Sequence, residues 1–346
     1  MTEKATILLA MPWHNDIYKV MESALTYHGF QVIPIIFNDG AFRYPSFFTR
    51  FQTKFRQIIL QDKNAKRKLK EKLFDEKIKA VVEAIEGGID YALFIRADLY
   101  PAHLLEAVQK KTRMNMVNYQ WDGMNRYPEI WSKTKYFDRF FIFSPDDLQY
   151  TDYSFLPTTN FYFDHDLNNM PPIDADFYFT GSHMPNRMRS VILFGELAQD
   201  MGWKLNFNIG WFEQDIKKAK NIYPRNINIF SHEKSFSENL NQAKRAKVLV
   251  DFKTPIHNGL SFRAFEALGY HKKLITTNEN IKKYDFYHPD NIFVWDGTNL
   301  NGINEFLAIP YHPIDPEIYK KYSFGNWIRY ILQFQSYQSI YLPIKN

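Results

Sequence analysis

An arginine and a glutamate lie three residues apart in the segment HNGLSFRAFEALGYHKKLITTN, which covers residues 257–278. The apolar residues around them have helical spacing, so we expect a helix that begins near Leu260 or Ser261. On such a helix Arg263 and Glu266 share one face. A guanidinium binds phosphate oxygens in pairs, and a carboxylate accepts hydrogen bonds from sugar hydroxyls. The helix end could therefore hold a nucleoside diphosphate, although a salt bridge on a surface helix explains the same spacing.

Three further residues with acid–base chemistry follow segments that we predict to be strands. His14 lies in MPWHND, Asp98 in IRADLYP and Asp122 in YQWDGMNRYP. Functional groups of α/β folds gather at the carboxyl ends of strands, so His14 or Asp122 could act as a general base, with Asp98 as a third candidate. Trp121 and Tyr127 flank Asp122 and could stack on a sugar ring. Each of the three polar residues could equally satisfy local backbone groups in a loop.

Strand-like and helix-like segments alternate along the chain. Apolar runs that predict strands include ATILLAM, FQVIPIIF, YALFIRAD, MNMVNYQ and RFFIFS in the first half, and DFYFTGS, KLNFNIG, KVLVDF and KLITT in the second. Most of the segments between them have helical spacing, including one long stretch from about Ser46 to Glu86. The alternation predicts an α/β fold with two doubly wound, Rossmann-like domains that face a central crevice.

Composition excludes several classes of protein. With 45% hydrophobic and 23% charged residues, the 346-residue chain is an ordinary globular protein. It has no cysteine, which excludes disulfides, thiolate zinc sites and a cysteine nucleophile. The first residues, MTEKATILLAMPWHND, have a short apolar run without a basic leader, so we predict a strand and not a signal peptide. No apolar run approaches the roughly 20 residues of a membrane span, and we expect a cytoplasmic protein.

The net charge of +5 is small, but one region concentrates it. The segment FFTRFQTKFRQIIL precedes the basic run KNAKRKLKEK, which covers residues 63–72. Basic and aromatic residues mixed on a helix could contact an anionic membrane such as the inner membrane, or form a solvated helix whose Phe residues face the core. The sequence has none of the usual nucleic-acid recognition motifs, so we expect no nucleic-acid partner.

Three segments of the second half resemble one family. The stretch NGLSFRAFEALGYHKKLITTN is similar to the donor site of GT-B glycosyltransferases, particularly those of bacterial lipopolysaccharide and capsular polysaccharide biosynthesis, with a group 1-like donor domain. The stretch DFYFTGSHMPNRMRSVIL resembles the first strand, glycine turn and helix of that donor domain. The stretch YKKYSFGNWIRYIL resembles the C-terminal helix that crosses back to the first domain. In the first half only the α/β pattern and VNYQWDG resemble the family.

The resemblance implies a role for individual residues. It implies that Glu266 binds the ribose of a nucleotide-sugar donor and that Arg263 contacts its diphosphate. The remaining residues that it places at the donor are Gly181, Ser182, Arg187, Arg189, His257, Asn258, Gly259, Leu260, Ser261, Thr277 and Asn278, with Thr276 beside them. Retaining members of the family commonly have a second glutamate eight residues before the first, and here that position is Asn258. The stereochemistry of transfer therefore stays open.

The resemblance also implies domain boundaries and an activity. We expect an acceptor-side domain over residues 1–160, a linker over 161–174, a donor domain over 175–322 and a crossing helix over 323–346. The implied activity is transfer of a sugar from a nucleotide sugar to a bacterial surface glycan or glycolipid, with Trp121, Tyr127 and Asp98 near the acceptor. Two alternatives have the same architecture, a non-catalytic sugar- or nucleotide-binding protein and a sugar-nucleotide epimerase.

Two Asp-x-Asp pairs raise the possibility of a metal-dependent GT-A enzyme. Asp164 and Asp166 form one pair, and Asp174 and Asp176 form the other. Carboxylates at this spacing can hold Mg²⁺ or Mn²⁺ on a diphosphate. Both pairs lie in or next to the predicted linker, between two complete α/β halves, so we expect neither a metal nor another cofactor.

Overall fold

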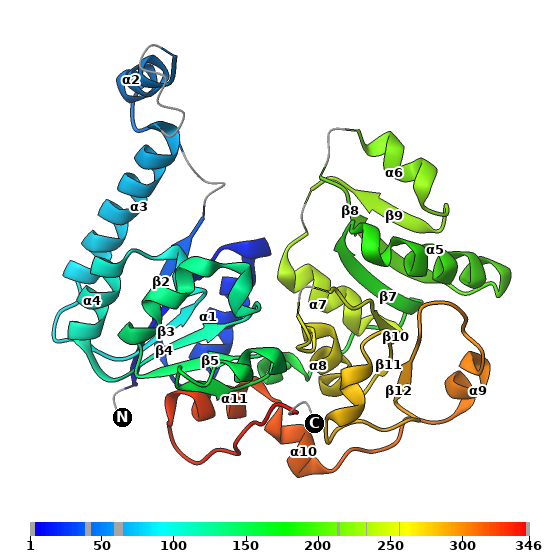
Figure 1. Ribbon diagram of the computed structural model, residues 1–346. Helices are drawn as coiled ribbons and strands as arrows, with labels where there is room; N and C mark the ends of the chain where they lie inside the picture. The colour runs from blue at the N-terminus through cyan, green and yellow to red at the C-terminus, as the bar shows by residue number, and fades with distance from the viewer. Residues whose placement is uncertain are drawn as a thin grey trace.

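The computed structural model describes residues 4–38, 43–58, 65–212, 215–232, 234–255 and 257–343. Two parallel sheets of six strands each lie side by side, with helices on both faces of each sheet (Figure 1). The predicted α/β architecture of two doubly wound domains is confirmed. None of the described helices is long and apolar enough to cross a membrane.

The first sheet has the strand order β2-β1-β3-β4-β5-β6. Its strands are β1 (Thr6–Pro12), β2 (Gln31–Phe37), β3 (Ile89–Ile95), β4 (Thr112–Gln120), β5 (Arg139–Ile142) and β6 (Phe155–Pro157). Along β1 the side chains alternate between two buried clusters, with Ile7, Leu9 and Met11 in one and Leu8 and Ala10 in the other. This period of two explains why the strand is continuously apolar, since both of its faces are covered.

Helices α3 (Ala65–Glu83) and α4 (Ala102–Lys111) cover one face of this sheet, and α1 (Ile17–Tyr27) covers the other. The long stretch that we predicted to be helical, from about Ser46 to Glu86, contains two helices. The structure has a separate helix, α2 (Phe47–Ile58), before α3, and residues 59–64 between them lie outside the described residues.

The last helix of the chain, α11 (Phe324–Leu332), packs on the first sheet beside α1. Its Trp327 ring lies 5.3 Å from the ring of Tyr119 in β4. The Arg139 guanidinium donates hydrogen bonds of 2.7 and 2.8 Å to the carbonyls of Tyr330 and Ile331, where a helix end favours positive charge. The chain end therefore belongs to the core of the first sheet.

The second sheet has the strand order β12-β11-β10-β7-β8-β9. Its strands are β7 (Ala175–Ser182), β8 (Leu205–Gly210), β9 (Ile227–Phe230), β10 (Ala246–Asp251), β11 (Lys273–Thr276) and β12 (Ile292–Val294). Its helices are α5 (Pro185–Asp200), α6 (Ile216–Ile222), α7 (Phe236–Lys244), α8 (Phe262–Gly269), α9 (Ile303–Ala308) and α10 (Pro316–Lys321). We did not predict β9, β12, α6, α9 or α10 from the sequence.

Both sheets contain a point at which the strand order reverses. Numbered from one to six along the chain, the strands of the second sheet follow the Rossmann order 3-2-1-4-5-6, with the reversal between β7 and β10. In the first sheet the reversal lies between β1 and β3. Loops leave a parallel sheet in opposite directions at such a point and open a crevice at the carboxyl ends of the strands. The topology therefore predicts that the residues just after β1, β3, β7 and β10 line the crevice.

The segment between the two sheets is packed and not loose. Phe161 and Phe163 are buried in the first core, and the Tyr162 N–H donates a 3.1 Å hydrogen bond to the Tyr322 carbonyl. Gly325 in α11 donates its N–H to the Asp164 carboxylate at 3.2 Å. The two chain segments that pass between the domains, around Tyr162 and around Tyr322, therefore lie side by side and hold each other in place.

Candidate functional site

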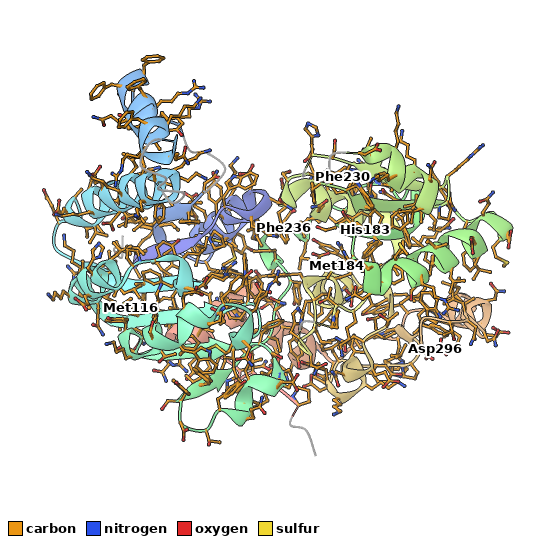
Figure 2. All side chains as sticks on the ribbon, turned by 45° about the horizontal axis from the view of Figure 1, so that its top comes forward. Met116, His183, Met184, Phe230, Phe236 and Asp296 are labelled. Carbon is orange, nitrogen blue, oxygen red and sulfur yellow. The ribbon has the colours of Figure 1, made fainter. Side chains whose placement is uncertain are left out.

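A cavity of about 590 Å³ lies between the domains, and the strand ends of both reversal points line it. From the first sheet come Pro12 and Arg96, and from the second come Ser182 and Asp251. Phe236, which is labelled between the two domains in Figure 2, lines the cavity and also packs against the first core. Charged lining residues are mostly basic, with Arg96, Arg126, Arg187, Lys234, Lys253 and Arg263 against Asp122, Asp251 and Glu266. Such a surface suits an anionic ligand.

The cavity brings most of the predicted site residues together. Those that line it are His14, Trp121, Asp122, Tyr127, Gly181, Ser182, Arg187, His257, Gly259, Ser261, Arg263, Glu266 and Asn278. Those that do not line it are Asp98, Arg189, Asn258, Leu260 and Thr277. Arg189 is exposed on α5, and Leu260 is buried in the core of the second domain. The Thr277 hydroxyl accepts a 2.8 Å hydrogen bond from the Lys253 N–H and so fixes a neighbouring loop.

The amino end of α8 opens toward the cavity. Ser261 occupies the N-cap position, but its hydroxyl donates a 2.8 Å hydrogen bond to Asp251 and does not cap the helix. The second carboxylate oxygen of Asp251 accepts a 3.0 Å hydrogen bond from the Thr276 hydroxyl. The first-turn N–H groups of α8 therefore have no side-chain cap, and an anion at this helix end would be stabilised by them.

Arg263 and Glu266 form an ion pair on α8. Their side chains are only 11% and 5% exposed, so the pair is not the surface salt bridge that we considered. Burial is the largest single effect and lowers the pKa of Arg263, but Glu266, Tyr178, Asp251 and Tyr270 together raise it by more, and the guanidinium stays charged. Burial raises the pKa of Glu266, and Arg263 offsets part of that rise. The Arg263 guanidinium also lies 4.6 Å from the centre of the Tyr178 ring, which fixes its direction.

Arg187 reaches the cavity from the first turn of α5. Its guanidinium donates to the Ser182 carbonyl and lies 5.2 Å from the centre of the Phe179 ring. A Cβ atom at Gly181 would lie 2.6 Å from this guanidinium, so the glycine leaves room for the arginine. Burial lowers the pKa of Arg187, and Asp251 opposes that shift. An arginine poised in this way can bind a phosphate in the cavity.

Gly259 and Asn258 connect the two domains. A Cβ atom at Gly259 would overlap the Phe143 ring, which belongs to the first domain, so only glycine fits this close approach. The Asn258 amide donates to the Asp146 carboxylate and accepts a 2.6 Å hydrogen bond from Lys253 Nζ. The Asn258 side chain therefore serves the contact between domains and does not face the cavity.

The first domain supplies an acidic and aromatic wall. The Asp122 carboxylate lies 2.7 Å from the Arg126 guanidinium. The Arg96 guanidinium lies 3.3 Å from the centre of the Tyr127 ring. Asp98 accepts hydrogen bonds of 2.5 and 3.2 Å from Arg96, so it positions this arginine and does not itself reach the cavity.

Two histidines line the cavity, one from each domain. His14 is exposed in the turn after β1, and its ring lies 6.1 Å from that of Trp121. The His257 ring lies 4.7 Å from the Phe143 ring. Burial lowers the pKa of His257, and its buried Nδ1 has no hydrogen-bond partner among the described residues. His257 is therefore a neutral imidazole at neutral pH.

Sequence reasoning missed several residues of the site, among them Asp251 and Arg96. Asp251 is the last residue of β10, directly beside the reversal point, and Arg96 follows β3 at the other reversal point. Arg96 has a left-handed backbone with φ of 62°, which turns the chain toward the cavity. The signal available in the sequence was their place at the ends of the apolar runs KVLVD and YALFIR.

A second cavity of about 510 Å³ shares Arg126 and His257 with the first. Asp147 lines it, and this side chain is almost completely buried. Burial raises the pKa of Asp147 to about 6, although the Met124 N–H donates a 3.1 Å hydrogen bond to the carboxylate. Between pH 4 and pH 6 the folded protein therefore keeps a proton that the unfolded chain has already released.

We expect Asp147→Asn to remove this pH dependence. As the pH rises through the pKa of about 6, the native protein loses the stability that a protonated Asp147 provides at pH 4. The shift of roughly two pKa units corresponds to about 3 kcal/mol. Urea unfolding should give similar free energies for the two proteins at pH 4 and a more stable variant at pH 7.5. The exposed Asp152→Asn is the control, and curves for wild type and Asp147→Asn that run parallel from pH 4 to pH 7.5 would contradict the prediction.

The first Asp-x-Asp pair is occupied by contacts that hold the fold. Asp164 accepts from Gly325 and lies 2.8 Å from His28 Nε2, and Asp166 lies 2.6 Å from Lys244 Nζ. In the second pair, Asp174 lies 3.3 Å from Arg245 and Asp176 lies 2.8 Å from Lys247. None of the four carboxylates lines the large cavity.

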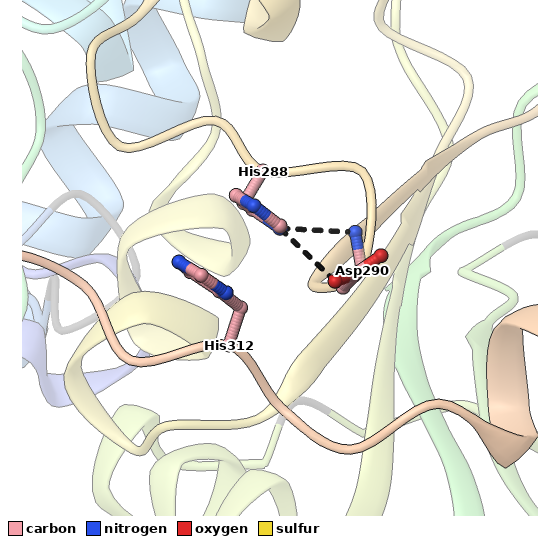
Figure 3. A group of neighbouring side chains, drawn as sticks. All are labelled: His288, Asp290 and His312. Atoms are coloured by element: carbon pink, nitrogen blue, oxygen red, sulfur yellow. Dashed lines mark hydrogen bonds and ion pairs between the residues drawn. The ribbon is translucent and has the colours of Figure 1, made fainter.

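Another group of possible metal ligands lies outside the large cavity. His288, Asp290 and His312 place one ligand atom each within 4.8 Å of one another (Figure 3). The two imidazole rings are stacked, 3.7 Å apart and 2° from parallel. Nitrogen lone pairs lie in the ring planes, so stacked rings direct them along parallel lines and not toward one ion. The arrangement is that of a ring stack that joins two loops.

Comparison with protein families and with curated proteins found no match. Among solved structures, an alpha-glucosyltransferase in complex with UDP-glucose and DNA containing an abasic site is 10% identical, with a TM-score of 0.56 over 87% of this chain and 88% of that chain. An alpha-glucosyltransferase in complex with UDP and a 13-mer DNA containing a HMU base is 12% identical, with a TM-score of 0.55 over 96% and 95%. At this identity the similarity establishes the fold, and the chain has the GT-B fold.

Proposed function

We propose that the protein is a glycosyltransferase that uses a nucleotide-sugar donor. One observation carries the proposal: a single cavity joins the uncapped amino end of α8, Arg187 and the Arg263–Glu266 pair to a facing wall with Asp122. The first group suits a diphosphate and a ribose, and the second suits an acceptor hydroxyl. Both matched structures contain UDP or UDP-glucose, which makes uridine nucleotides the first donors to test.

In the donor half, the diphosphate would lie between the end of α8 and Arg187. Arg263 has N–H groups besides the one that binds Glu266, and Glu266 has a second carboxylate oxygen for sugar hydroxyls. Ser182 and Asn278 line the same half. A donor held by N–H groups and guanidinium groups needs no metal.

In the acceptor half, Asp122 or His14 would remove the proton of the attacking hydroxyl. Trp121 and Tyr127 would hold a sugar ring by stacking, and the neutral His257 would accept from a hydroxyl. The acceptor that we propose is a bacterial surface glycan or glycolipid, because the donor-side motif resembles enzymes of lipopolysaccharide and capsule synthesis. The DNA in the matched structures is a property of those proteins, and transfer to DNA is the control arm of the acceptor assay.

A thermal-shift screen tests the donor proposal directly. A nucleotide sugar that binds only the folded protein must raise its melting temperature, by an amount that grows with ligand concentration. UDP-, ADP-, GDP- and CMP-sugars, with the free nucleotides, form the panel. Absence of a shift with every member at millimolar concentration would contradict the proposal. Analysis of the products then separates transfer to a glycan from isomerisation of the donor by an epimerase, and binding without either product indicates a non-catalytic protein.

We expect donor binding and turnover to survive EDTA. The carboxylates of the first Asp-x-Asp pair are bound to His28, Gly325 and Lys244 and lie outside the cavity. Melting temperature and product formation should therefore be the same within error before and after chelation. Loss of activity with EDTA that Mn²⁺ restores would show that the diphosphate is held by a metal, and Asp164→Asn would then be the variant to examine.

A further inference from the structure

Helix α2 exposes an aromatic face. Four of its side chains are large, apolar and exposed: Phe47 (83%), Phe48 (66%), Phe51 (61%) and Phe55 (47%). At 3.6 residues per turn, positions i, i+1, i+4 and i+8 lie within about 100° of the helix circumference. On the opposite side Thr53 is 5% exposed and Thr49 is half-buried. The helix thus turns its threonines inward and its phenylalanines outward, the reverse of an ordinary surface helix.

Basic side chains border this aromatic face. Arg50 and Lys54 lie on one side of it and Arg56 on the other, and all three are exposed. Residues 47–58 contain no aspartate or glutamate. The first turns of α3 extend the positive charge with exposed Lys66, Lys68 and Lys72. We refer to the exposed aromatic and basic side chains of α2, together with Lys66, Lys68 and Lys72, as the α2 surface.

The α2 surface stands away from the core of its domain. Ile78 and Val82, in the second half of α3, are buried in the first domain, whereas α2 lies by the other end of α3 (Figure 1). The four phenylalanines therefore contribute little to the folded core. A helix with exposed Phe and a basic border is the type that lies in the interface of a bilayer.

We propose that the α2 surface docks the protein on an anionic lipid bilayer. The phenylalanines would enter the boundary between headgroups and acyl chains, and the basic side chains would face the lipid phosphates. Charge complementarity favours this partner over a second copy of the chain, because two α2 surfaces would bring like charges together. A nucleic acid would pair with the basic residues but would not need four exposed phenylalanines. The inference does not rest on the proposed enzymatic activity.

Vesicle sedimentation tests the proposal with the full chain. We expect binding to vesicles that contain 30% phosphatidylglycerol, much weaker binding to pure phosphatidylcholine, and a decrease with salt. The triple variant Phe48→Ser, Phe51→Ser, Phe55→Ser should bind at least ten-fold more weakly. The double variant Arg50→Gln, Lys54→Gln should lose roughly five-fold for each charge removed. These side chains are exposed, so both variants should keep the melting temperature of the wild type.

A matched control removes exposed apolar side chains elsewhere. Met114, Ile173 and Ile309 are 58%, 47% and 40% exposed, and their triple replacement by serine should leave vesicle binding unchanged. Equal binding of the Phe variant and the wild type would overturn the proposal. So would a wild-type dimer that ignores vesicles and becomes monomeric in the Phe variant, or binding to DNA fragments in place of vesicles. Nucleotides should still raise the melting temperature of the Phe variant. This measurement reports on the donor site independently of vesicle binding.

Discussion

Asp122→Asn is expected to reduce turnover by about 10² to 10⁴ while leaving the affinity for the donor unchanged. Asp122 lies in the cavity wall that faces α8, and an amide cannot accept the proton of an attacking hydroxyl. The amide oxygen can still accept the hydrogen bond from Arg126, so the wall should keep its shape. Rates at saturating donor and donor affinity from thermal shifts, measured on the same preparation, give the two quantities separately.

Two comparisons decide what such a loss means. Arg126→Leu removes the partner of Asp122, and if the carboxylate acts only by holding Arg126, this variant should be as slow as Asp122→Asn. We expect it to remain much faster. His14→Ala tests the other candidate base, which lies on the same wall of the cavity, just after β1. Normal turnover of Asp122→Asn together with an inactive His14→Ala would exchange the two assignments. If neither substitution matters and the product keeps the anomeric configuration of the donor, the mechanism needs no side-chain base.

The layout of the fold could be predicted because long apolar segments decide it. Strands such as β1, β3 and β10 are buried on both faces, and such strands appear in the sequence as unbroken apolar runs. Short elements carry too few residues to show a period, which is why β12, with three residues, was not found. That α2 and α3 are separate helices was not predicted, because the sequence from Ser46 to Glu86 favours helix and contains no proline or glycine.

The donor half of the site was easier to predict than the contacts that it makes with the first domain. The spacing of Arg263 and Glu266 places them on one helix face whatever the tertiary structure. The burial of Arg263 and Glu266 could not be predicted from their spacing, because it depends on what packs against α8. The sequence alone indicated a surface salt bridge as readily as a ligand site. Asn258 and Gly259 adjoin the same motif, yet they meet Asp146 and Phe143, which come from another domain. Contacts between residues more than a hundred positions apart leave no local pattern.

Substitution of Glu266 should have the second large effect. Because its carboxylate is buried, the substitution should change the stability of the protein as well as donor binding. Glu266→Gln should weaken donor binding by about 1.5 to 3 kcal/mol, the range for a hydrogen bond to a charged group. Because the carboxylate is buried against Arg263, the substitution also leaves a guanidinium without its counter-charge. Breaking a buried pair in this way costs about 3 to 5 kcal/mol in the free energy of unfolding. Glu196→Gln, on the exposed side of α5, is the matched control and should change neither quantity.

A double variant separates the structural role of the pair from its role in binding. Replacing a buried ion pair by apolar residues of similar size is often neutral or stabilising, so Arg263→Met with Glu266→Met should recover most of the lost stability. It should not recover donor binding, because Arg263, the partner of the phosphate, and Glu266, the partner of the ribose, are then both absent. Urea unfolding and donor titration on the same variant give the answer. A stable double variant that binds the nucleotide sugar as tightly as the wild type would show that the pair only holds α8 in place. The residues that bind the donor would then be Arg187 and the amino end of α8.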